Sequence, residues 1–319
     1  MIGTTTTVRA LITGALLLAT AAQAEVYTLD GFGHGSNVVI AVNGQRLGPQ
    51  PCTFDFAWGK RYTITYVSEL KGDRQFRGST GPILFAAPAA FAALPEPAWV
   101  KDVSAARQRY PHYSVRVGKG EAKLLSVALD RARSEARHAM ADNAPADPAQ
   151  DQQAELKDST VLECHWRKSR KGVYAAYALL GVKDRDAPAA AAPKLPELPA
   201  GVPAWFVRPG TCVKEGHKVA FGTQPVTDNT LRGRLFDRAK SRARAEHARM
   251  AQAKIQTSHN ARGGRSRSMR TSMTLRGAMS LESLVLKEAD GAMVLFCAIS
   301  APPGSPTKGG HTRFKRRSK

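Results

Sequence analysis

The stretch ALDRARSEA, residues 128–136, decides the expected fold, because the chain repeats its pattern as LFDRAKSRA at residues 235–243. Around the first copy, apolar residues recur at spacings of three and four, namely Leu125, Leu129, Ala132, Ala136 and Ala139. Such spacing forms one apolar stripe along a helix. The pattern therefore predicts a long helix over residues 121–140 and a second helix in the repeat, with small side chains that allow close packing on a sheet.

The segments that flank both stretches also recur. The segment Pro97-Ala98-Trp99-Val100 returns as Pro203-Ala204-Trp205-Phe206. Short strands are expected at 113–117 and 218–221, ending at tight turns on Gly118 and Gly222. Hairpins are expected from 161–167 with 173–182 and from 281–287 with 292–301. The second copy is longer between helix and hairpin, where it holds the basic segment 258–276, which we expect to form a Ser- and Gly-rich loop.

These repeats predict an α+β fold with two repeated modules, each a long helix on a small antiparallel sheet, preceded by a small all-β module. The β module is expected at 25–80 and the two larger modules at 97–183 and 203–302. Pro- and Ala-rich linkers at 81–96 and 184–202 would be extended. A basic tail at 303–319 has no apolar period and is expected to be disordered.

The expected β module rests on alternating apolar runs with turn residues between them. Strands are expected at 38–42, 53–56 and 62–66, with turns at Asn43-Gly44 and Trp58-Gly59. Asn-Gly is a strong hairpin signal because both turn residues need positive φ.

The first 24 residues have the order of a secretory signal peptide. A basic residue, Arg9, precedes an apolar run from 10 to 22, which closes with Ala22-Gln23-Ala24. A membrane anchor is the alternative, but the run is short and is interrupted by Thr13 and Gly14. We therefore expect an exported protein, periplasmic or extracellular, with no transmembrane span after cleavage.

The charge distribution points to an anionic partner. The formal net charge is +21 with a pI near 10.2, and residues 203–319 hold 23 Lys and Arg against 7 Asp and Glu. Such a field attracts polyanions. The candidate contact residues are Arg232, Arg234, Arg238, Lys240, Arg242, Arg244, Arg249, Arg262, Arg265, Arg267, Arg270, Arg313, Lys315, Arg316 and Arg317. A solvated helix face followed by a flexible loop is the alternative interpretation.

No residue pattern predicts an active site, a cofactor or a metal. The four cysteines are scattered singly and no histidine pair has ligand spacing. Cys212 and Cys297 are the candidate disulfide, with buried free thiols as the alternative. Glu163 and Glu282 hold matching positions on expected strands, which favours a structural role over paired acid and base catalysis.

Two family resemblances follow from these motifs. The Pro-Ala-Trp segment, glycine-ended strand, alanine-spaced helix and Tyr- and Ala-rich hairpin at 97–182, and again at 203–301, resemble the LPP-twenty family of bacterial envelope lipoproteins, which is related to a module of a flagellar assembly protein. The resemblance implies an envelope protein without known chemistry, although no lipidation cysteine follows the signal peptide. The segment 36–68 resembles a PEGA domain, a small β module of surface-associated bacterial proteins.

The sequence thus predicts an exported, non-enzymatic envelope protein with an assembly or interaction role. Its basic C-terminal third is expected to contact anionic polysaccharide, peptidoglycan or lipid, or an envelope protein. A secreted polyanion- or nucleic-acid-binding protein is the alternative, and an enzyme of unknown class comes third. The oligomeric state, the pairing of cysteines and the packing of the two modules are left open.

Overall fold

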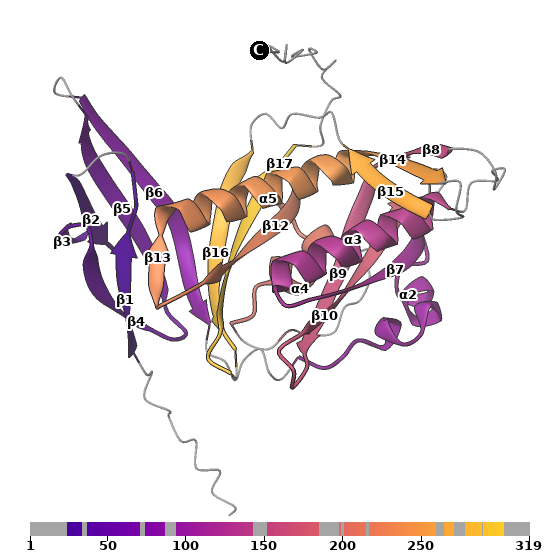
Figure 1. Cartoon of the computed structure of the whole chain (residues 1–319), viewed down its shortest axis with the longest axis horizontal. Coiled ribbons are helices and arrows are strands. Elements are labelled where there is room, and N and C mark those ends of the chain that lie inside the picture. Colours follow the sequence, from indigo (N-terminus) through magenta and orange to yellow (C-terminus); the bar gives the residue numbers. More distant parts are fainter. Residues whose placement is uncertain are drawn as a thin grey trace, which may run out of the picture.

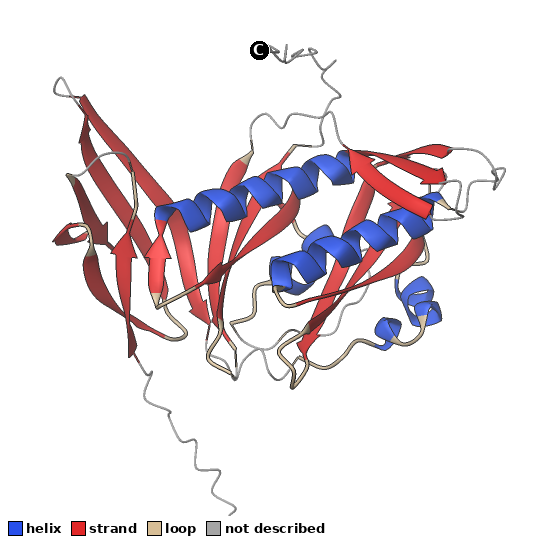
Figure 2. Cartoon of the chain, viewed as in Figure 1, coloured by secondary structure: helices blue, strands red, loops and turns tan. Residues whose placement is uncertain are grey.

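The computed structural model describes residues 24–33, 37–70, 74–86, 94–142, 152–184, 198, 201–214, 217–259, 265–270, 278–288 and 290–302. The expected signal peptide at 1–23 and the basic tail from 303 onward lie outside this range. Within it, strands dominate, and the two longest helices, α3 (Leu125–Ala141) and α5 (Gly233–Ala251), lie across them (Figures 1 and 2).

An eight-stranded sheet forms the centre of the molecule and contains strands from both the N-terminal and the C-terminal parts of the described chain. Its order is β11-β12-β17-β16-β6-β5-β2-β3. The strands are β11 (Val213–Lys214), β12 (His217–Val226), β17 (Met293–Ala301), β16 (Met279–Lys287), β6 (Arg74–Ala86), β5 (Arg61–Leu70), β2 (Val38–Val42) and β3 (Gln45–Pro49). Because β6 pairs in parallel with β16, residues near the N-terminus continue the sheet built near the C-terminus.

Three smaller sheets complete the β structure. Their orders are β13-β1-β4, β7-β10-β9 and β15-β14-β8. The strands are β1 (Ala24–Asp30), β4 (Cys52–Ala57), β13 (Thr230–Arg232), β7 (Tyr113–Ala122), β9 (Ser159–Lys168), β10 (Tyr174–Lys183), β8 (Gln152–Lys157), β14 (Gln252–His259) and β15 (Arg265–Arg270). The short helices are η1 (Ala98–Val100), α2 (Val103–Arg109), α4 (Ala204–Val207) and η2 (Pro209–Thr211).

The expected α+β fold of two repeated modules after a separate β module is wrong, because the chain is mostly β and its sheets are shared between the expected parts. Strand β1 pairs with β13, which leads into α5. Strand β8, which follows α3, pairs with β14, which follows α5. These long-range pairings join the expected modules to one another, and local periodicity cannot reveal them.

The expected linker at 81–96 is also partly wrong, because Pro82 lies inside β6. Pro82 pairs with Thr63 of β5, and the register shifts next to this pair. The shift marks a bulge in β6 at Thr80 and Gly81, where Gly81 has a φ of +75°. Proline is tolerated in sheets at such irregularities. The Thr80 hydroxyl lies 3.2 Å from the Ile64 amide, which donates to it where the ladder is interrupted.

The predicted turn at Asn43-Gly44 is confirmed, with φ values of 49° and 84°. Gly118 and Gly222, expected to end strands, instead lie inside β7 and β12, and Gly120 also lies inside β7. A Cβ on Gly118 would lie 2.1 Å from the carbonyl oxygen of Ala132 in α3. These glycines therefore allow close contact between helix and strand rather than a turn.

Apolar side chains from distant segments fill two main cores. In one, Phe206 packs edge-on against Trp166 and Phe296, with both ring centroids 4.8 Å away. In the other, Phe56 stacks on Phe85 at 4.3 Å, and this cluster reaches α5 through Phe236. The cores connect the N-terminal strands to α5 and the first hairpin to the second.

Candidate functional site

Helix α5 carries six of the predicted contact residues, Arg234, Arg238, Lys240, Arg242, Arg244 and Arg249. It runs along the central sheet and contacts β12 and β17 (Figure 1). Its alanine stripe, including Ala239 and Ala243, is buried. Arg234, Arg238 and Arg244 are exposed on the solvent side, so these three guanidinium groups are available to a ligand.

Three other predicted contact residues on α5 are engaged within the molecule. The Lys240 ammonium donates to the Thr80 carbonyl at 3.4 Å, and Arg242 donates to the Thr223 carbonyl at 2.8 Å. Arg249 lies 3.8 Å from the Glu246 carboxylate. Arg232, at the end of β13, is half-buried. Sequence reasoning treated all these cations as one surface, whereas several stabilise the fold.

The basic segment after α5 is not the predicted loop in its described part. Residues 252–259 and 265–270 form the antiparallel pair β14 and β15, with Lys254 opposite Arg270 and Thr257 opposite Arg267. This ribbon places Arg265, Arg267 and Arg270 on a strand beyond the end of α5 (Figure 1). Arg262, Arg313, Lys315, Arg316 and Arg317 lie outside the described residues.

A buried ion pair between the two long helices was missed by the sequence analysis. Arg137 on α3 is fully buried, and its guanidinium lies 2.6 Å from the carboxylate of Glu246 on α5. Burial opposes ionisation of Glu246, but Arg137 and Arg133 outweigh it and hold its pKa at about 2. Arg133 also lies over the Phe221 ring, 4.5 Å from its centroid. These contacts dock α3 against α5 and β12.

The matching glutamates, Glu163 and Glu282, hold the two recurring tryptophans. The indole nitrogen of Trp99 donates to Glu163 at 3.0 Å, and that of Trp205 donates to Glu282 at 3.1 Å. Arg109 and Arg61 complete the respective ion pairs. Each carboxylate thus bonds both a tryptophan and an arginine of the fold, in line with a structural role.

The candidate disulfide is not formed in this structure. Cys297 lies 3.2 Å from the Ser283 hydroxyl, and Cys212 lies 3.5 Å from the Arg208 carbonyl oxygen. They belong to different cores, so the structure does not bring the two thiols together. Burial raises the pKa of Cys297 and of Cys164 to about 11, which keeps these thiols protonated near neutral pH.

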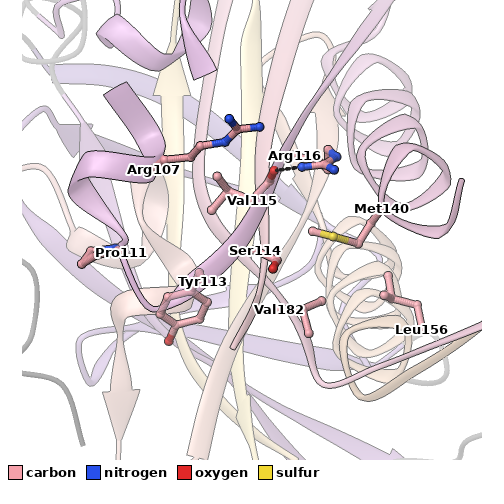
Figure 3. Close-up of a pocket in the computed structure, with 9 residues that line it drawn as sticks. All are labelled: Arg107, Pro111, Tyr113, Ser114, Val115, Arg116, Met140, Leu156 and Val182. Atoms are coloured by element: carbon pink, nitrogen blue, oxygen red, sulfur yellow. Dashed lines mark hydrogen bonds between the residues drawn. The ribbon is translucent and has the colours of Figure 1, made fainter. Parts of the chain in front are cut away.

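A hollow of about 680 Å³ lies beside β7. Figure 3 shows its lining, with Met140 from α3, Leu156 from β8 and Val182 from β10 beside the strand. Arg107 and Arg116 contribute positive charge, and Arg116 donates to the Val115 carbonyl at 2.8 Å. The cavity thus combines apolar walls with two guanidinium groups.

Two further observations concern metals and membranes. In the described part of the chain, no group of three or more His, Cys, Asp or Glu side chains is arranged to hold a metal ion. Across those same residues, no helix has the length and apolar character needed to cross a membrane.

No protein-family model matches the chain, and no curated protein matches it. The resemblance to the LPP-twenty family and to PEGA domains therefore stays a prediction.

Proposed function

We propose that this chain is an exported, non-enzymatic envelope protein whose α5 face binds anionic envelope material. The observation that carries the proposal is the exposure of Arg234, Arg238 and Arg244 on one helix, within a chain of net charge +21. Only one acidic residue on this part of the helix, Asp237, is exposed beside them. An anionic polymer or membrane surface would relieve the repulsion between these cations.

The basic ribbon extends the same interaction. Because β14 begins where α5 ends, Arg265, Arg267 and Arg270 follow the helix along the molecule. A long ligand such as a glycan strand could contact helix and ribbon together. The buried, protonated thiols and the glutamates bonded within the fold favour a binding role over a catalytic one.

A salt-graded retention assay on peptidoglycan, lipopolysaccharide and DNA tests this proposal. The triple variant Arg234→Gln, Arg238→Gln, Arg244→Gln should elute at lower salt, with a log–log salt slope reduced by roughly three. The matched control replaces Arg46, Lys60 and Arg77, which are exposed on the N-terminal strands and turns, and removes the same charge. This control should retain the original slope.

The outcomes separate the candidate functions. Retention on an envelope component with loss only in the α5 variant supports the proposal. Retention on DNA alone supports the alternative, a nucleic-acid-binding protein. Equal loss in both triple variants shows that net charge, and not the α5 face, determines binding, and absence of retention at low salt contradicts any polyanion role.

A further inference from the structure

Strand β7 leaves one edge open in the part of the chain that the structure describes. It pairs with β10 on one side and ends its sheet on the other. The carbonyls of Val115 and Glu121 accept bonds from the side chains of Arg116 and Arg131, at 2.8 and 2.5 Å. Because backbone groups alternate along an antiparallel strand, Val115, Val117 and Lys119 direct their N–H and C=O groups toward this edge.

The chain itself shows how such an edge accepts another strand. A Cβ on Gly120 would lie 2.2 Å from the Ala128 carbonyl oxygen and 2.6 Å from the Ala132 amide nitrogen. For Gly222 the distances to the carbonyl oxygen of Ala239 and the amide nitrogen of Ala243 are the same. The two strands therefore pack on their helices alike.

Aligned on Gly120 and Gly222, His217 and Lys218 of β12 correspond to Val115 and Arg116. Aligned on Gly118, which packs on α3 in the same way, they correspond to Tyr113 and Ser114. Strand β11 pairs at these two residues of β12, with Lys214 opposite His217 and Val213 opposite Lys218. The pairing is antiparallel. On β7 the corresponding position borders the cavity of about 680 Å³ instead.

The charges and walls of that cavity indicate what would fill it. Figure 3 shows Arg107 of α2 and Arg116 of β7 on either side of Val115. Arg107 is exposed and Arg116 half-buried, so both can reach an anionic side chain. The apolar walls at Met140, Leu156 and Val182 suit an aliphatic side chain.

We propose that the edge of β7 at Val115–Val117 binds an extended acidic segment of a partner protein as an added antiparallel strand. Backbone hydrogen bonds supply affinity, and alternate side chains supply specificity. Carboxylates of the segment pair with Arg107 and Arg116, while an apolar neighbour enters the cavity. On binding, the Arg116 guanidinium moves away from the Val115 carbonyl oxygen, which then accepts a hydrogen bond from a backbone amide of the partner. This site is separate from the polyanion-binding face on α5.

Fluorescence polarisation tests the proposal on the whole protein, with a labelled hexapeptide in which two adjacent glutamates are flanked by valines. Adjacent side chains of a strand point to opposite faces, so this peptide can place one carboxylate near each arginine. The same peptide N-methylated at alternate amides keeps its charge but cannot complete the ladder, and should bind roughly tenfold more weakly. A valine–lysine peptide should not bind. Equal affinity for the methylated peptide would show that charge alone attracts it and would overturn the strand-addition proposal.

Variants locate the site and separate it from α5. Arg107→Ala with Arg116→Ala should weaken peptide binding roughly tenfold, and the exposed Arg107→Ala alone should weaken it less. Arg131→Ala, which alters the same edge farther along, and the α5 glutamine triple should bind as the unchanged protein does. Loss only in the α5 triple would overturn the proposal while leaving the polyanion function intact.

Amide hydrogen exchange provides the second readout. Val115 and Val117 should exchange quickly in the free protein and become protected when the peptide is added. If the amides of Val115 and Val117 were already protected in the free protein, another segment of this chain would cover the edge. That result would contradict the proposal of a partner strand.

Discussion

The edges of β7 and β12 have the same helix packing but opposite surroundings. The β12 edge is covered by α3, whose Arg133 lies 3.4 Å from the Phe221 carbonyl oxygen, and the Phe221 ring is fully buried. At the counterpart position of β7 stands Lys119, which pairs with Glu121 at 2.7 Å while both side chains are more than half exposed. One side chain thus distinguishes an interior edge from a surface edge.

This difference indicates how the chain protects an unpaired strand. Charged side chains on an open edge disfavour pairing with other chains. On β7 the Lys119–Glu121 pair lies in the half near Gly120, whereas the half at Val115–Val117 carries one charged side chain, Arg116, and borders the cavity. The comparison therefore predicts an accessible edge at one end of β7 and a buried edge along β12.

Exchanging the two side chains should produce the largest effect. Phe221→Lys removes a buried ring and places a cation beside Arg133, so we expect a loss of about 4 kcal/mol or more in the free energy of unfolding. Lys119→Phe should change stability by less than about 1 kcal/mol. Urea unfolding measures both free energies. Similar losses for the two variants would contradict the claim that the β12 edge is buried and the β7 edge exposed.

Lys119→Phe should instead alter association. An exposed aromatic ring on an unpaired edge promotes contact between molecules. Sedimentation velocity at increasing concentration should show larger species for this variant than for the control Lys119→Arg, which keeps a cation beside Glu121. An unchanged distribution of species would show that the Lys119–Glu121 pair is not needed to protect β7.

The counterpart glutamates should differ almost as strongly. Glu246→Ala leaves Arg137 and Arg133 buried without their carboxylate and should cost about 3–5 kcal/mol. Glu135, which occupies the matching position on α3, is exposed, and its substitution by alanine should cost less than about 1 kcal/mol. Chemical denaturation of both variants checks the contrast; a small cost at Glu246 would mean that α3 docks through apolar contacts alone.

Local sequence patterns predicted individual elements better than their assembly. The turn at Asn43-Gly44 was clear because its residues tolerate positive φ. The proline-based linker was wrong because a bulge accommodates Pro82 within β6. The pairings of β6 with β16 and of β8 with β14 join segments far apart in sequence, and no local period encodes them.

The helix alignment shows a similar limit at the site. Sequence similarity matches residues 128–136 with 235–243, and the packing of Gly118 and Gly222 gives the same match, Ala132 with Ala239. The packing of Gly120 and Gly222 instead matches Ala132 with Ala243, one helical turn away, and pairs Glu135 with Glu246. Alanine and arginine recur every three or four residues, so both alignments fit the pattern. Only the structure separates the exposed arginines of α5 from the cations that bind backbone.

The pH dependence of stability sharpens the role of Glu246. Its pKa is about 2 in the folded protein against 4.5 for an ordinary glutamate, because Arg137 and Arg133 outweigh the opposing effect of burial. The stabilisation is therefore complete above about pH 4.5 and is lost as the pH falls toward 2, with a full loss of roughly 3 kcal/mol.

Unfolding free energies measured from pH 6 down to pH 3 test this dependence. The unchanged protein should lose stability more steeply below pH 4.5 than Glu246→Gln, which cannot titrate at this position. Parallel curves for the two proteins would show that Glu246 does not contribute to acid sensitivity.

The smallest effects concern the glycines that the two edges share. A Cβ at Gly120 or Gly222 would meet a helix carbonyl oxygen at 2.2 Å, so alanine at either position should cost about 1–3 kcal/mol. Lys119→Ala, on the same strand but exposed, serves as the control and should change stability by less than about 0.5 kcal/mol. Because the clash is with backbone, shortening Ala128 or Ala239 to glycine should not rescue either variant. Thermal unfolding that shows a loss at Gly222 alone would mean that α3 adjusts its distance from β7, and the two edges would then differ in packing as well as in charge.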